Sequence, residues 1–181
     1  MWRWSSLSHT HRNTIGLDNL EELYLSRYEL MNKKFLIPIV KGDMHNLPFK
    51  SNGFDCVVIN HVLEHSKNPL SVIDEIHRVL KSKGKLIIGV PNYGSFQSRL
   101  LKSLVGSDFY AYVKEHKNFF DVLSLNRMIK NKFNIKQIRG TAFHIHLIGK
   151  FFELPLMRRI VKRLADNYIR LSQDIIVFAE K

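Results

Sequence analysis

The chain has 181 residues, of which 45% are hydrophobic and 24% charged, and this composition is ordinary for one globular domain. It excludes intrinsically disordered, collagen-like and low-complexity classes. The net charge of +12 is uneven, because residues 92–181 carry 16 lysines and arginines against 7 acidic residues. We interpret this excess as a solvated basic surface, and charge alone gives no strong evidence for nucleic-acid binding.

A single cysteine, Cys56, excludes an intramolecular disulfide and is typical of a protein from the reducing cytoplasm. It lies in an apolar run, so we expect a buried core side chain rather than a nucleophile. The N-terminus has no apolar core of signal-peptide length, and the longest uncharged run, residues 86–98, is too short to span a bilayer. We therefore expect a cytoplasmic location.

Expected strands and helices alternate along the first half, which is typical of an α/β fold. Short strands are expected at 13–17 and 35–40, with a helix over 20–31 between them. Pro38 removes a backbone donor from the second of these strands, which places that strand at a sheet edge.

A second strand–helix–strand unit follows. The apolar run at 54–60 predicts a buried strand, Pro69 opens a helix that ends at Lys83–Gly84, and residues 85–90 predict the next buried strand. This order predicts a right-handed parallel crossover.

The second half of the chain is less regular. We expect a helix from Phe96 that ends at Gly106, and another that Asp121 caps. Strands at 135–138 and 174–180 suit an antiparallel pair at a sheet edge. Residues 155–171 form a strongly amphipathic segment, for which we favour packing on the sheet and keep peripheral membrane contact as an alternative.

Polar residues follow the expected strands at their carboxyl ends, where ligands bind in open α/β sheets. An acidic side chain there can accept hydrogen bonds from ribose hydroxyls or an adenine amino group, although Asp18 can equally cap the next helix. The candidates, in chain order, are Asp18, Gly42–Asp43, Asn60–His61, Glu64–His65 and Pro91–Asn92.

Four segments in this order resemble class I S-adenosylmethionine-dependent methyltransferases, in the broad group that acts on small molecules. They are GLD at 16–18, GDMHNLPFKSNGFDCVVINHVLEH at 42–65, IDEIHRVLKSKGKLIIGVPN at 73–92 and HKNFFDVLSLNRMIKNKFNIKQIRG at 116–140. The resemblance implies a Rossmann-like α/β sheet, S-adenosyl-L-methionine as cofactor, and methyl transfer to a small organic acceptor.

The resemblance also implies cofactor-binding roles for individual residues. Asp18 matches the residue that holds the ribose hydroxyls. Asp43 matches the residue near the adenine amino group, with Met44 packing on the ring. Asn60 and His61 match positions beside the methionine portion and the methyl group.

On the acceptor side, the resemblance points to the turn after residues 54–60 and to the later insert. These regions supply His61, Glu64, His65, Tyr93 and His116. A histidine can deprotonate a hydroxyl near neutral pH, so we place His61 and His65 first as catalytic bases, with Glu64 beside them and His116 after them. Each histidine could equally have a packing role, and we assign no metal ligand.

One family feature is missing from the sequence. A strand and a glycine-rich D-x-G-x-G-x-G loop should precede Asp18, yet Gly16 is the first glycine. That strand would be central, so its absence should expose backbone edges on both neighbouring strands. We therefore expect an N-terminally truncated fold, with 1–12 disordered or non-native and 13–181 as the methyltransferase-like domain. Residues 92–120 and 141–171 are expected as substrate-side or helical insertions, and impaired activity stays open.

Several other functions stay open. One is a non-catalytic methyltransferase-like binding module, and another is a membrane-associated scaffold. More remote is a zinc hydrolase, because residues 61–65 fit the H-x-x-E-H signature through His61, Glu64 and His65, which requires both histidines on one helix face. A divalent metal that assists O-methyl transfer through Glu64 and His65 is a further alternative. The sequence does not fix the acceptor, its nucleophilic atom or the oligomeric state.

Overall fold

The computed structural model describes residues 13–19, 38–106, 115–141, 169 and 172–181. The chain divides into two units, Met1–Lys50 and Ser51–Lys181, each of which is described by itself. The expectations for residues 1–12, for the helix over 20–31 and for the amphipathic segment 155–171 lie outside the described residues, apart from Ile169.

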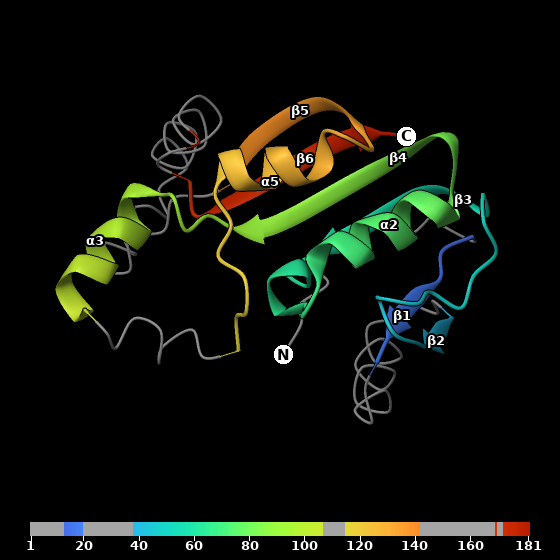
Figure 1. The fold of residues 1–181 in the computed structure, drawn as a ribbon, viewed down its shortest axis with the longest axis horizontal. Coiled ribbons are helices and arrows are strands. Elements are labelled where there is room, and N and C mark those ends of the chain that lie inside the picture. Colours follow the sequence, from blue (N-terminus) through green and yellow to red (C-terminus); the bar gives the residue numbers. More distant parts are fainter. Residues whose placement is uncertain (1–12, 20–37, 107–114, 142–168, 170–171) are drawn as a thin grey trace, which may run out of the picture. The chain divides into compact units, whose positions relative to one another are not determined.

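The first unit contains a two-stranded parallel sheet (Figure 1). Strand β1 (Gly16–Asp18) pairs with β2 (Ile39–Lys41) in a register that places Gly16 opposite Ile39 and Asp18 opposite Lys41. Pro38 directly precedes β2, and its carbonyl oxygen accepts a hydrogen bond from the Gly16 amide at 2.8 Å. Both strands were predicted, and each ends one residue later than expected.

The second unit contains a four-stranded mixed sheet in the order β3-β4-β6-β5 (Figure 1). The strands are β3 (Phe54–Asn60), β4 (Leu80–Pro91), β5 (Asn134–Thr141) and β6 (Asp174–Glu180). β3 and β4 are parallel, whereas β6 is antiparallel to β4 and to β5. The predicted crossover and the predicted antiparallel pair are confirmed, with β5 as the outer member of that pair.

Three helices begin at residues that satisfy their first amides. Helix α2 (Pro69–Val79) begins after Asn68, whose side chain accepts from the Ser71 amide. Helix α3 (Phe96–Val105) begins after Ser95. Helix α5 (Val122–Ile129) begins with a capping box between Asp121 and Ser124. Asparagine, serine and aspartate are preferred at this position because a short side-chain oxygen reaches the free amides.

The ends of two helices differ in how well the sequence indicated them. Gly106 ends α3 with a φ of +58°, as predicted. α2 ends at Val79, four residues before the predicted stop, and the chain passes directly into β4. Leu80 is fully buried and pairs with Phe54, so β4 begins at Leu80 and the Lys83–Gly84 turn lies within it.

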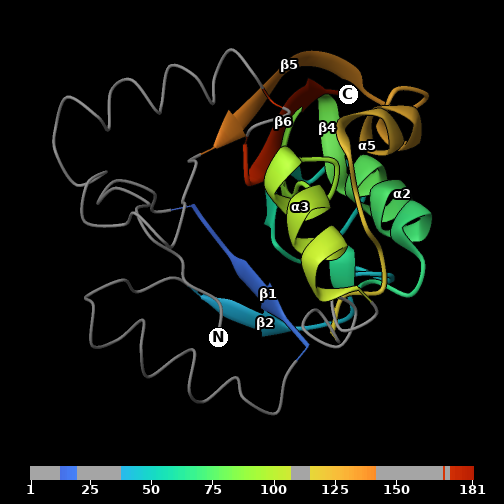
Figure 2. The ribbon, with the colours of Figure 1, turned by 90° about the vertical axis from the view of Figure 1, so that its left-hand side faces the viewer.

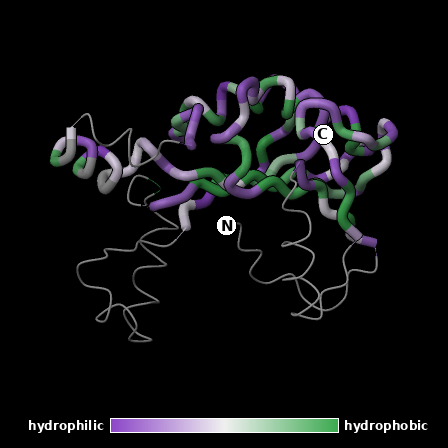
Figure 3. The backbone as a smooth tube through the Cα atoms, turned by 90° about the horizontal axis from the view of Figure 1, so that it is seen from below, coloured by the Kyte–Doolittle hydropathy of each residue, from purple (hydrophilic) through white to green (hydrophobic). Residues whose placement is uncertain are grey.

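The core of this unit lies between the sheet and helices α2 and α5, which cover the same face (Figure 2). Hydrophobic stretches run through the centre of the unit (Figure 3). The His77 and Phe133 rings meet edge to face, and Lys132 pairs with Asp74 at 2.6 Å, so α2 is held against the turn that follows α5. Burying each aliphatic core side chain contributes about 1.5–3 kcal/mol. These side chains are Val72, Ile73, Ile76 and Val79 on α2, Leu125 and Ile129 on α5, Leu86, Ile88 and Val90 on β4, and Ile175 and Val177 on β6.

Strand β3 lies at the edge of the four-stranded sheet, and this position corrects the prediction for Cys56. Within the described residues, β4 is the only strand paired with β3. Ile59 is buried on the helix-covered face, whereas Cys56 and Val58 alternate to the opposite face and are exposed. The apolar run was interpreted as a strand buried on both faces.

Candidate functional site

The first group of candidate residues lies at the carboxyl ends of β1 and β2. The Gly42 amide donates to the Asp18 carbonyl oxygen at 2.9 Å, which fixes the chain as it leaves β2. A side chain at Gly42 would approach Leu17 Cδ1 to 2.7 Å, so glycine permits this close path. Asp18 thus ends β1, one residue later than the predicted strand, and Asp43 lies two residues after β2 at the same end of the small parallel sheet.

Asp43 is exposed and is held by the residue two positions later. Its carboxylate accepts from the His45 amide at 2.9 Å and hydrogen-bonds the His45 Nδ1 at 2.7 Å. The backbone hydrogen bond from His45, with the ring bond added, lowers the pKa of Asp43 below its usual value. Met44 is half-buried in the same turn. The turn therefore presents an ionised carboxylate with local partners.

The second group lies at one edge of the four-stranded sheet. The parallel strands β3 and β4 both end there, and the antiparallel strand β6 begins there at Asp174. Asn60 ends β3 opposite Gly89, and a side chain at Gly89 would lie 2.0 Å from Asn60 Oδ1. Glycine at this position thus leaves the space that the Asn60 side chain occupies.

The turn after β3 begins at His61, which has a φ of +52°. This left-handed conformation costs a non-glycine residue on the order of 1 kcal/mol, and histidine adopts it more often than most residues do. The His61 amide still donates to the Gly89 carbonyl oxygen at 2.9 Å. A 3-10 turn, η1 (Leu63–His65), follows and buries Leu63 and Glu64 completely. The backbone at His61 therefore turns the chain so that a carboxylate enters the interior.

Glu64 is fully buried, and neither of its carboxylate oxygens has a hydrogen-bond partner among the described residues. The nearest ionisable groups are His61 Nδ1 at 3.5 Å and His65 Nε2 at 4.0 Å from Oε1. Buried carboxylates are normally paired and hydrogen-bonded, because the charge is expensive to desolvate. Glu64 therefore has two histidines at ion-pair distance but no close hydrogen bond from the described residues.

Residues 117 and 118 are hydrogen-bonded to this turn. The Glu64 carbonyl oxygen accepts from the Lys117 amide at 2.8 Å and from the Asn118 amide at 3.0 Å. Asn118 Nδ2 also donates to the Ser66 carbonyl oxygen at 2.7 Å. These bonds bring His116, which is 52 positions further along the chain, beside Glu64.

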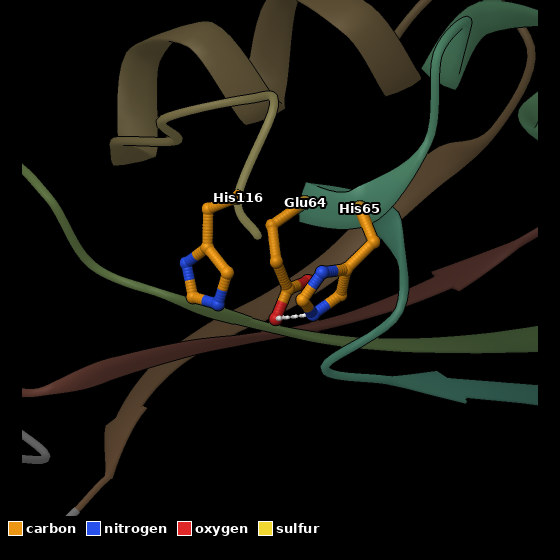
Figure 4. Close-up of side chains that lie close together, drawn as sticks. All are labelled: Glu64, His65 and His116. Atoms are coloured by element: carbon orange, nitrogen blue, oxygen red, sulfur yellow. Dashed lines mark ion pairs between the residues drawn. The ribbon is translucent and has the colours of Figure 1, made fainter. Parts of the chain in front are cut away.

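His65 and His116 approach each other and Glu64 (Figure 4). Their ring centroids are 4.7 Å apart with the rings nearly perpendicular. His65 Nδ1 hydrogen-bonds the Glu115 carbonyl oxygen at 3.0 Å, and His116 Nδ1 hydrogen-bonds the Tyr93 hydroxyl. Glu64 and His65 belong to η1, whereas His116 comes from the segment before α5, and their polar ends face one another (Figure 4).

His61 lies between two carboxylates, since its Nε2 is 3.6 Å from Asp174 Oδ1. The Glu64 carboxylate is the main cause that raises the pKa of His61, against the opposing effect of burial. Burial raises the pKa of Asp174, although His61 and a 3.0 Å hydrogen bond from the Thr141 hydroxyl oppose this. His61 is consequently protonated at a higher pH than an ordinary histidine.

His116 and Tyr93, on the other side of Glu64, are uncharged near pH 7. Burial lowers the pKa of His116, and the neighbouring His65 adds to this shift. Burial also raises the pKa of Tyr93 to about 12, with a smaller contribution from the Glu64 charge. Tyr93 therefore keeps its phenolic proton.

The structure brings five of the predicted residues together: His61, Glu64, His65, Tyr93 and His116. Sequence reasoning missed Asp174 and Thr141. A usable signal existed, because the first residue of an antiparallel strand lies at the edge where parallel neighbours end. Asp18, Asp43 and Met44 belong to the other unit and are described with it.

The arrangement does not meet the requirement of a helical H-x-x-E-H peptidase motif. His61 follows a strand with a left-handed backbone, and Glu64 and His65 lie in a three-residue 3-10 turn. The two motif histidines therefore do not share one face of an α-helix.

A sheet in this order, with its last strand antiparallel and polar residues at the strand ends, defines a Rossmann-like α/β fold of the methyltransferase type. The family model described as a methyltransferase domain matches residues 3–88. This range contains β1, β2, η1 and most of the β3–α2–β4 crossover.

Two curated relatives illustrate the sequence similarity. An uncharacterised protein of Methanocaldococcus jannaschii is 42% identical over 102 residues, which cover 56% of this chain and 40% of that protein. A demethylmenaquinone methyltransferase of Thermotoga maritima is 31% identical over 117 residues, which cover 56% of this chain and 49% of that enzyme. The chain thus spans less than half of the length of these relatives.

The fold is similar to that of a crystal structure from Thermotoga maritima, described as a methyltransferase dependent on S-adenosylmethionine and a possible histamine N-methyltransferase. The TM-score is 0.63 at 20% identity, over 93% of this chain and 72% of that one. The family model thus matches just under half of this chain, and the fold is that of solved structures described as methyltransferases dependent on S-adenosylmethionine. Within the described residues, no helix is long and apolar enough to cross a membrane.

Proposed function

We propose that this protein transfers a methyl group from S-adenosyl-L-methionine to a small organic acceptor. The match of residues 3–88 to the methyltransferase domain carries this proposal, because it runs through both sets of strand ends. The relative from Thermotoga maritima, a demethylmenaquinone methyltransferase, supports a small-molecule acceptor rather than a macromolecule.

On the cofactor side, we assign contacts to Asp18, Asp43, Met44, Asn60 and His61. The Asp18 carboxylate would accept from the ribose hydroxyls, and Asp43 would lie near the adenine amino group. The exposure of Asp43 supports this role, since its carboxylate is ionised and open to solvent while His45 holds its orientation. Asn60 and His61 then contact the methionine portion.

On the acceptor side, we assign catalytic roles to His61, His65 and Glu64. In the transfer, a nucleophilic oxygen, nitrogen or carbon attacks the sulfonium methyl. The new bond to carbon forms as the sulfur–carbon bond breaks, and S-adenosylhomocysteine leaves. An acceptor hydroxyl would lose its proton to a neutral histidine, and because the pKa of His61 is raised, His61 would serve as the base only at a pH above that pKa. The protein otherwise contributes alignment and the exclusion of water.

Calorimetric titration with S-adenosylmethionine and S-adenosylhomocysteine tests the cofactor part of the proposal. We expect micromolar binding to the folded chain. Loss of one hydrogen bond to a charged group costs about 1.5–3 kcal/mol, so Asp18→Ala should weaken binding by roughly ten- to a hundredfold.

Asp55→Ala is a suitable control, because Asp55 is an exposed strand carboxylate that pairs with Lys81 at the opposite end of β3. It should bind as the unaltered protein does. A folded sample that binds neither compound, or an Asp18→Ala variant with unchanged affinity, would contradict the assignment.

A further inference from the structure

Ring nitrogen atoms of His65 and His116 lie close to the buried Glu64 carboxylate. His65 Nδ1 is 3.0 Å from the Glu115 carbonyl oxygen. A carbonyl oxygen only accepts hydrogen bonds, so this nitrogen carries the proton and donates it. In the neutral ring, Nε2 then holds a lone pair, and this is the nitrogen that faces Glu64 Oε1 at 4.0 Å. With the ring in this tautomer, a ring nitrogen with a lone pair and a carboxylate oxygen lie 4.0 Å apart.

His116 approaches the Glu64 carboxylate from the side opposite His65 (Figure 4). One ligand atom from each of Glu64, His65 and His116 lies within 4.8 Å of the others. The Tyr93 hydroxyl can accept a hydrogen bond from the Nδ1–H of His116, which leaves Nε2 as the ligand atom. Histidines that bind metals characteristically donate their second ring N–H to a carbonyl, a carboxylate or another oxygen, and both rings have such a partner here.

We propose that Glu64, His65 and His116 form a binding site for a divalent first-row transition cation of the Zn²⁺ type. Two donors at about 2.1 Å from a tetrahedral Zn²⁺ lie roughly 3.3 Å apart. The present spacing therefore requires inward movements of about 1 Å, which side-chain rotation supplies. The cation would neutralise the carboxylate that the described chain leaves without a hydrogen bond.

The donor set distinguishes the class of cation. Two imidazoles with one carboxylate suit zinc and its neighbours, whereas Mg²⁺ and Ca²⁺ prefer oxygen ligands. Three protein ligands also leave a position for water or for another oxygen, as in catalytic rather than structural zinc sites. His61 lies just outside this set, with Nδ1 at 3.5 Å from the same Glu64 oxygen, where it orients the carboxylate.

Metal binding itself does not depend on the proposed methyl transfer. Its consequence for the reaction rests on the proposed function. A cation with an open position would bind an acceptor hydroxyl and lower the pKa of that hydroxyl, so that the oxygen is a better nucleophile. Glu64 would then act as a ligand rather than as the base.

The test is a titration of the chelator-treated protein with Zn²⁺, measured as bound metal per chain, and with Co²⁺, measured as visible absorption. We expect one Zn²⁺ per chain and the intense absorption bands of low-coordinate Co²⁺. His116→Ala and Glu64→Gln should each weaken Zn²⁺ binding at least tenfold. Thermal unfolding without metal shows whether these variants stay folded.

The matched control removes a histidine elsewhere. His77 lies on α2 against Phe133, and the His77→Ala variant should bind Zn²⁺ as the unaltered protein does. The proposal is overturned if the folded protein binds no Zn²⁺. It is also overturned if both cluster variants bind as tightly as His77→Ala, which would place the metal on other histidines. Binding of S-adenosylhomocysteine is measured on the same samples, so that failure of the metal site is distinguished from failure of the proposed function.

Discussion

Two turns at the ends of strands place a carboxylate in opposite environments, one exposed and one buried. After β2, Asp43 is exposed and is bound by the amide and the ring of His45, two residues further on. After β3, Glu64 is fully buried, and no hydrogen bond from a described residue reaches its oxygens. The first carboxylate is hydrogen-bonded within its own turn, whereas the second has only the longer ion-pair contacts with His61 and His65.

The difference lies in the free energy that each carboxylate costs when no ligand is bound. An exposed carboxylate with local hydrogen bonds is stable whether or not anything binds to it. A buried carboxylate without such bonds costs free energy in the unliganded protein, and this cost is tolerated at sites that later receive a cation or a proton. Around Glu64, the histidines come from η1 and from a segment about 50 residues away. The site therefore depends on tertiary packing, whereas the Asp43 turn depends on its local sequence.

The largest effect is expected from the residue that anchors the buried turn. Leu63 is fully buried directly before Glu64, so Leu63→Ala should lower the free energy of unfolding by about 2–5 kcal/mol. Leu123 on α5 is 62% exposed, and Leu123→Ala should change stability by only about 0.5 kcal/mol. Urea unfolding compares the two variants. Equal effects would mean that the turn is not packed into the core, which would remove the contrast with the Asp43 turn.

A third carboxylate gives an intermediate effect and a dependence on pH. Asp121 caps α5, and the hydrogen bond from the Ser124 amide is the main cause that lowers its pKa below the ordinary value of 3.8. Asp121→Ala should cost about 1 kcal/mol at pH 6. Because the folded pKa is the lower one, this contribution is fully present above pH 3.8 and is lost as the pH falls through the folded value.

Unfolding of both proteins by urea at pH 6 and near pH 3 measures this loss. The difference between the unaltered protein and Asp121→Ala should shrink in acid. A difference that stays constant would mean that the charge on Asp121 does not contribute to the cap.

The smallest effect on stability is expected for Gly89→Ala. This substitution tests the position of the Asn60 side chain. A methyl group there would meet Asn60 Oδ1 at 2.0 Å, and the end of a side chain can move away. We expect Gly89→Ala to change stability by less than about 1 kcal/mol, while displacement of Asn60 weakens binding of S-adenosylhomocysteine several-fold. Asn60→Ala alone should weaken binding equally, and the double variant no further. Additive losses would show that Gly89 acts independently of Asn60.

Much of the fold was predictable because its signals are local. Asn68–Pro69, Asp121 and Gly106 mark helix ends, and the apolar runs mark β3, β4 and β6. The exposure of Cys56 was not predictable from its run, because an apolar strand is equally compatible with a central and an edge position. The end of α2 was also missed, since the pairing of Leu80 with Phe54 overrides the later Lys83–Gly84 stop signal.

The candidate site was predictable as a set of residues but not as a geometry. The strand-end rule and the family resemblance together selected Asn60, His61, Glu64 and His65. The complete burial of Glu64 depends on Leu63 and on the segment that crosses the turn, and neither contact has a local signal. Asp174 was missed because it begins its strand, and only the antiparallel orientation of β6 relative to β4 brings this first residue to the edge where β3 and β4 end.

Amide hydrogen exchange with and without S-adenosylhomocysteine tests the central claim most directly, because it reports on both units of the same molecule. The account predicts slower exchange in residues 42–45, after β2, and in residues 60–65, after β3. Unchanged exchange in both segments of a folded sample, or slowing confined to other parts of the chain, would contradict the assignment of these strand ends to the cofactor.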